Sequence, residues 1–69
     1  MRLSRRKDKV RMHIDKGPSI DGILMGRSRS HYVLRAATVI KDEEASFTVD
    51  GEVKIPVGRV LFYQTLVET

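Results

Sequence analysis

Positively charged side chains are the residues of this chain whose type and spacing could do chemistry. One group lies in the middle of the sequence and comprises Arg27, Arg29, His31 and Arg35. A guanidinium fork matches the geometry of a phosphate, and His31 or the neighbouring Tyr32 could stack on a nucleic-acid base. The group therefore suggests contacts to a phosphate backbone without sequence readout. The alternative is a solvated loop whose arginines pair with the acidic run 42–44. We favour it because four cations are few for a nucleic-acid site.

A second basic group lies at the N-terminus. Residues 1–9 account for the whole formal net charge of +4, because the rest of the chain has as many acidic as basic side chains. The cations of this segment are Arg2, Arg5, Arg6, Lys7 and Lys9. A basic arm on a neutral body is suited to nucleic acid or to an acidic protein groove. The alternative is a solubilising terminus without a partner. We expect an arm over residues 1–9, with at most a short helix.

Catalytic and metal-binding chemistry is thinly represented. The chain has no cysteine and only two histidines, and neither histidine lies near paired carboxylates, so we expect no metal site. His13 is interpreted as a surface residue, and Asp15 and Asp21 as turn residues rather than an acid–base pair. No glycine-rich phosphate loop precedes a helix, and no serine lies in a nucleophile setting. We therefore expect a protein that is not an enzyme, with no cofactor and no small-molecule substrate.

Length and composition favour one small globular domain. The 69 residues are 41 % hydrophobic and 32 % charged, which is typical of a folded chain but allows only one core. No apolar run approaches the ~20 residues that a membrane-spanning helix needs. We expect a soluble, cytoplasmic protein with no membrane partner. Because no disulfide can support so small a core, self-association is the expected means of stabilisation.

Alternating apolar and polar residues predict strands rather than helices. Gly and Pro in the segment 15–18 predict a turn, and Asp50-Gly51 is a strong signal for a hairpin. Gly22 and Gly26 are expected to share one strand face, which predicts bending or the close approach of another backbone. We expect strands over residues 10–14, 19–26, 32–40, 47–49, 53–55 and 60–67. Short strands with bending glycines predict an all-β fold in which residues 10–67 form a small closed barrel.

The order of these segments resembles the Sm-like (Lsm) family of small β-barrels. The resemblance rests on the segments 22–24, 32–34, 51–55 and 60–62, which read Gly-Ile-Leu, Tyr-Val-Leu, Gly-Glu-Val-Lys-Ile and Val-Leu-Phe. It covers roughly residues 10–64 and implies a five-stranded barrel that joins its neighbours through exposed strand edges. The chain also resembles small proteins of tailed phages of actinobacteria, which implies a component of a phage particle.

Two family motifs differ in this sequence. The family places an acidic residue and an asparagine in the loop between its second and third strands, whereas the loop here reads Arg-Ser-Arg-Ser-His over residues 27–31 and is one residue shorter. The family's Arg-Gly after the fourth strand is replaced by Pro56-Val57-Gly58-Arg59. The fold can carry over, but we do not expect the uridine-binding pocket of the RNA-binding members.

Apolar residues on both faces of two strands predict an oligomer interface. The candidate residues are Ile23, Met25, Leu61 and Tyr63. A small barrel has one interior, so a second apolar face needs a partner, and we expect a homo-oligomer that forms a ring. The alternative is a monomer in which Leu61 and Tyr63 pack beneath the N-terminal arm. The first hypothesis for function is an assembly module that docks through the basic arm on a larger partner. The second is a ring that binds RNA or single-stranded DNA without sequence specificity.

Overall fold

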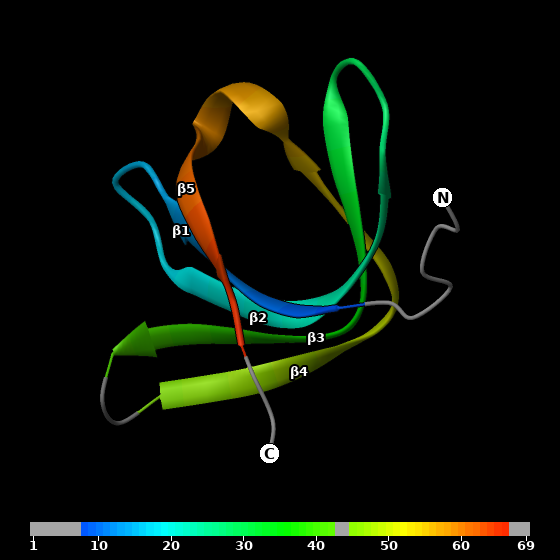
Figure 1. Ribbon diagram of the computed structural model, residues 1–69. Helices are drawn as coiled ribbons and strands as arrows, with labels where there is room; N and C mark the ends of the chain where they lie inside the picture. The colour runs from blue at the N-terminus through cyan, green and yellow to red at the C-terminus, as the bar shows by residue number, and fades with distance from the viewer. Residues whose placement is uncertain (1–7, 43–44, 67–69) are drawn as a thin grey trace.

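A single antiparallel sheet forms the described part of the molecule. The computed structural model describes residues 8–42 and 45–66, which are coloured in Figure 1. Its elements are β1 (Lys9–Ile14), β2 (Ser19–Arg27), β3 (His31–Asp42), β4 (Ala45–Pro56), the 3-10 helix η1 (Val57–Arg59) and β5 (Val60–Thr65). The strand order is β4-β3-β2-β1-β5, and every neighbouring pair is antiparallel. The expected all-β fold is confirmed, with five strands.

The sheet is curled but open. Within the described residues, β5 pairs only with β1, and β4 pairs only with β3. Figure 1 shows η1 arching from the end of β4 to the start of β5. A ladder between β4 and β5 would close the sheet, but η1 connects these strands without pairing them. The expected closed barrel is therefore not observed in the single chain, because among residues 8–42 and 45–66 the second edges of β4 and β5 pair with no other strand.

β4 runs without interruption through Asp50-Gly51, where the sequence predicted a hairpin. That prediction was wrong. Asp50 and Gly51 together oppose the single residue Ala36 of β3, and both Gly51 (φ 78°) and Ala36 (φ 52°) have positive φ. An extra residue in one strand of an antiparallel pair bends and twists the sheet locally. The Asp-Gly dipeptide therefore marks a bend within one long strand.

The two glycines of β2 have different surroundings. A Cβ atom at Gly22 would lie 3.2 Å from the Arg35 carbonyl oxygen and 3.3 Å from the Ala37 Cα atom, whereas one at Gly26 would meet nothing within 4 Å. The register between β2 and β3 shifts between Leu24 and Gly26, which moves Gly26 off the face of Gly22. The predicted close approach of another backbone is confirmed for Gly22 and is wrong for Gly26.

The core lies on the concave face of the sheet. Its buried residues are Val10, Met12, Ile20, Leu34, Ala37 and Ile55. Directly opposed residues on neighbouring strands share a face. The pairings therefore define one apolar row across all five strands, from β5 to β4: Tyr63, Met12, Ile20, Val39 and Phe47. The middle of this row is buried, and its two ends are aromatic side chains on the edge strands.

Two loops hold η1 and so fix where β5 begins. The Asp15 N–H donates to the Arg59 carbonyl oxygen (2.8 Å), and the Arg59 guanidinium donates to the Asp15 carbonyl oxygen (3.2 Å). At the other end of η1, the Val57 N–H donates to the Ser30 carbonyl oxygen (2.9 Å). The turn predicted at residues 15–18 is confirmed, and it contacts the start of the last strand.

Candidate functional site

β5 presents an uncharged and largely exposed surface. The segment Val60–Thr65 contains no charged residue, and all of it except Val60 is exposed. Every large apolar side chain that is exposed in the described residues lies on an edge strand: Leu61 (62 %), Phe62 (55 %) and Tyr63 (40 %) on β5, and Phe47 (52 %) on β4. Apolar side chains gathered at the two edges mark these edges as the candidate site.

On the side away from β1, the backbone N–H and C=O groups of β5 pair with no other strand in the part of the chain that the structure describes. The Leu66 N–H donates to the Lys9 carbonyl oxygen (2.8 Å), and Val10 lies opposite Thr65. The direction of backbone N–H and C=O groups alternates along an antiparallel ladder. The backbone groups of Gln64 therefore point toward β1, and those of Tyr63 and Thr65 point away from it. Donors and acceptors on the outer side of an edge strand are a template for adding another strand.

The β4 edge is partly protected by its sequence. Pro56 lies opposite His31 of β3. The N–H of the next residue, Val57, points toward β3, because it donates to the carbonyl oxygen of Ser30, the residue before that strand. By the same alternation, Pro56 faces the free side, where its missing N–H removes no ladder bond. The strand also carries Asp50, Glu52 and Lys54. Charges and proline are the features by which edge strands resist unspecific pairing, and β5 has neither.

His13 packs against β5 on the outer face of the sheet, which is the face opposite the concave core face. Its ring stacks on Phe62 with centroids 4.4 Å apart, and its Nε2 atom donates to Gln64 Oε1 at 2.9 Å. Its Nδ1 atom lies 3.4 Å from the Ser19 hydroxyl, which is long for a hydrogen bond. The sequence-based interpretation of His13 as a plain surface residue missed these contacts. Its partners lie on two other strands, and only the register shows that they meet.

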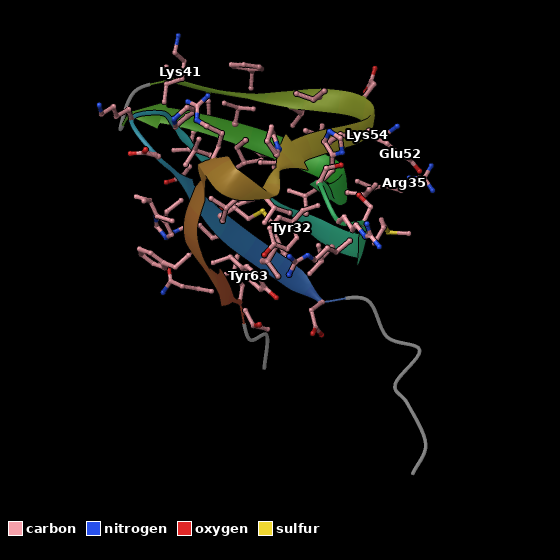
Figure 2. All side chains as sticks on the ribbon, turned by 90° about the horizontal axis from the view of Figure 1, so that it is seen from above. Tyr32, Arg35, Lys41, Glu52, Lys54 and Tyr63 are labelled. Atoms are coloured by element: carbon pink, nitrogen blue, oxygen red, sulfur yellow. The ribbon has the colours of Figure 1, made fainter. Side chains whose placement is uncertain are left out.

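On the concave side, an aromatic contact links β5 to β3. The rings of Tyr32 and Tyr63 meet edge to face with centroids 5.7 Å apart, and the Arg27 guanidinium lies 5.3 Å from the Tyr32 centroid. Figure 2 shows the two tyrosines close together. Edge-to-face pairs and cation–π contacts are both favourable. This cluster therefore helps to hold β5 over the core although β3 and β5 are not paired.

The four predicted interface residues do not form one continuous face. Ile23 opposes Lys9 and Arg35, which places it on the outer face, whereas Tyr63 opposes the buried Met12 on the concave side. Leu61 lies where the register between β1 and β5 shifts, and Met25 lies at the corresponding shift between β2 and β3. Leu61 and Tyr63 belong to the β5 edge, and Ile23 and Met25 do not.

The structure also separates the predicted basic cluster. Arg27 lies over Tyr32, and Arg35 lies on the outer face opposite Glu52. Arg29 is exposed in the turn after β2, where the Ser28 hydroxyl accepts from the His31 N–H (3.1 Å). Of the predicted arm, Lys9 begins β1. The remaining arm cations lie outside the described residues: Arg2, Arg5, Arg6 and Lys7.

Most charged side chains of the described residues form no ion pair. The one ion pair among them joins Arg11 Nε to Asp21 Oδ1 at 2.7 Å, and Arg11 Nη2 also donates to Asp21 Oδ2 at 2.9 Å. The hydrogen bonds and the charge of Asp21 raise the pKa of the Arg11 guanidinium. Asp21 therefore pairs with a residue of the neighbouring strand. The sequence-based interpretation of Asp21 as a turn residue was wrong. No three His, Asp or Glu side chains of the described segments are grouped to hold a metal ion.

Known proteins add no assignment to this geometry. No protein-family model, no curated protein and no solved structure matches the chain. No helix within residues 8–42 and 45–66 is long and apolar enough to cross a membrane.

Proposed function

We propose that this protein is a non-enzymatic assembly module that forms a homo-oligomer through its strand edges. The observation that carries the proposal is the β5 edge. It combines an uncharged strand, exposed apolar side chains on both faces, and free backbone groups at Tyr63 and Thr65. An edge with these properties in a chain this small favours pairing with another strand.

The most suitable partner for the β5 edge is the β4 edge of a second copy. Each chain has one edge of each kind, with exposed Phe47 on the β4 edge and exposed Phe62 and Tyr63 on the β5 edge. A contact between unlike edges is heterologous, so a growing array has one unpaired edge at each end until it closes. In a closed ring of Sm-like barrels, every β5 edge is paired with the β4 edge of the next copy. We propose that this ring docks through its basic N-terminal segment on a larger partner, as a component of a phage particle.

The second candidate is a ring that binds RNA or single-stranded DNA without sequence specificity. Unpaired Arg29 and the basic segment support it, because phosphate neutralisation drives such binding. The Arg27 guanidinium over Tyr32 weighs against it, because this contact occupies both a cation and an aromatic face that the predicted site would use. We therefore keep assembly as the proposed function.

The experiment is a light-scattering measurement of molar mass for the wild type, Thr65→Pro and Thr65→Val. The Thr65 N–H points to the free side, so proline there removes a donor for a second copy without removing a bond to β1. Valine keeps that N–H and is the matched control. We expect the wild type and Thr65→Val to be oligomers and Thr65→Pro to be a folded monomer.

Two results would contradict the proposal. A wild-type chain that stays at the monomer mass of 7.9 kDa at high concentration would exclude the oligomer. An oligomer that Thr65→Pro leaves intact would show that assembly does not use the β5 edge. Circular dichroism of each variant shows whether the sheet is retained, so loss of assembly is distinguished from loss of folding.

A further inference from the structure

The outer face of the sheet carries cations that form no ion pair with any other described residue. The pairings place Lys9, Ile23, Arg35 and Glu52 in one row across β1, β2, β3 and β4, and Lys54 lies beside this row, opposite Val33. Within the described segments, Lys9, Arg35 and Lys54 have no ion-pair partner. Arg35 and Glu52 are directly opposed without forming one. We call Lys9, Arg35 and Lys54, with Ile23 and Val33 between them, the outer patch.

The outer patch lies apart from the aromatic cluster. Figure 2 shows Arg35, Glu52 and Lys54 together at one end of the β3–β4 pair, away from Tyr32 and Tyr63. The Lys41 side chain lies at the opposite end of the same pair (Figure 2). The patch thus combines three exposed cations with two half-buried aliphatic side chains, and it has no aromatic ring.

We propose that the outer patch is a docking surface for an acidic protein partner, which places carboxylates on the three cations and an apolar group on Ile23 and Val33. Charge complementarity favours a partner with acidic side chains, and an apolar centre with a charged rim is the usual anatomy of a protein interface. One feature argues against single-stranded nucleic acid, because the patch offers no aromatic ring on which a base could stack. The surface exists on a single chain, so the proposal does not depend on oligomer formation.

Fluorescence anisotropy with two labelled probes tests the proposal. The probes are a short peptide of repeated Glu-Glu-Leu and an oligothymidylate of matched length. The proteins are the full-length wild type, the double variant Arg35→Gln/Lys54→Gln, and Lys41→Gln as the control from the other end of the same strands. The basic N-terminal segment is present in all three proteins, so any contribution from it cancels in the comparison.

We expect the wild type to bind the peptide more tightly than the oligothymidylate, with an affinity that falls as salt is added. Two exposed charge pairs are each worth up to ~1 kcal/mol, so the double variant should bind the peptide about 2- to 30-fold more weakly. Lys41→Gln should bind it as the wild type does. All substituted side chains are exposed, so the thermal midpoints should agree.

Three results would overturn the proposal. The first is an absence of peptide binding by the wild type at low salt. The second is an equal loss of peptide affinity for Lys41→Gln and the double variant, which would show a response to total charge alone. The third is tighter binding of the oligothymidylate that falls in the double variant, which would make the patch a nucleic-acid surface.

Discussion

Replacing each glycine of β2 by alanine tests the description of how the sheet bends. At Gly22 an added Cβ would lie 3.2 to 3.3 Å from the Arg35 carbonyl oxygen, the Ala37 Cα and the Leu34 Cβ atoms. These atoms belong to the backbone or to a fully buried side chain, so they cannot rotate away. Overpacking of this kind costs about 1 to 3 kcal/mol. At Gly26 nothing lies within 4 Å and φ is not positive, so alanine should be neutral or stabilise by about 0.4 to 1 kcal/mol.

The assay is thermal unfolding followed by far-ultraviolet circular dichroism at one fixed protein concentration. For a domain of this size, 1 kcal/mol corresponds to roughly 4 to 8 °C in Tm. We expect Gly22→Ala to unfold at a temperature lower by at least ~4 °C and Gly26→Ala to match or exceed the wild type. Equal losses for the two variants would mean that β2 approaches β3 along its whole length. A Tm of Gly22→Ala equal to that of the wild type would mean that β2 and β3 are further apart at this position than the structure shows.

Changes at β5, at the N-terminus and at the Arg11–Asp21 pair test the described contacts. Leu61→Asp should abolish the oligomer but leave the monomer folded, because this side chain is already 62 % exposed; a loss of the strand signal in circular dichroism would contradict this. Deleting residues 1–7 should leave the fold intact, whereas deleting 1–9 should lower Tm, because the carbonyl groups of Asp8 and Lys9 accept hydrogen bonds from Leu24 of β2 and from Leu66, the residue after β5; equal Tm values would refute it. Asp21→Asn should cost about 1 kcal/mol or less, and less at high salt, because the Arg11 side chain of the pair is 41 % exposed, although that of Asp21 is only 15 % exposed. The raised pKa of Arg11 means that the guanidinium's contribution to this pair is present at neutral pH and is lost as pH rises through that pKa, so urea unfolding should give the same cost for Asp21→Asn at pH 7 and at pH 9.

The sequence predicts the strands well because their alternation is local. Val10, Met12 and Ile14 alternate with polar residues, and the structure places β1 there. The error at Asp50-Gly51 has a physical cause. The same dipeptide with positive φ suits a two-residue hairpin and a bulge, and only the pairing with β3 decides between them. Closure of the barrel could not be predicted either, because it depends on whether β4 and β5 meet.

The candidate site was only partly predictable for the same reason. The apolar character of β5 and the exposure of Leu61 and Tyr63 follow from a strand with apolar residues on both sides. The contacts of His13 with Phe62 and Gln64, and the separation of Arg27 from Arg35, depend on register across strands that are distant in sequence. A register shift of one residue reverses the face of every following side chain. The alternation of residues along one strand therefore identifies which of its side chains share a face, but not which side chains of other strands lie beside them.

Sedimentation of the wild-type protein over a range of concentrations shows whether the β5 edge joins copies of this chain. We expect one species at a fixed multiple of 7.9 kDa, with a mass that changes little with salt because apolar side chains and backbone hydrogen bonds hold it together. A species that remains at 7.9 kDa at every concentration would contradict the claim, as would a mass that rises continuously without reaching a closed oligomer.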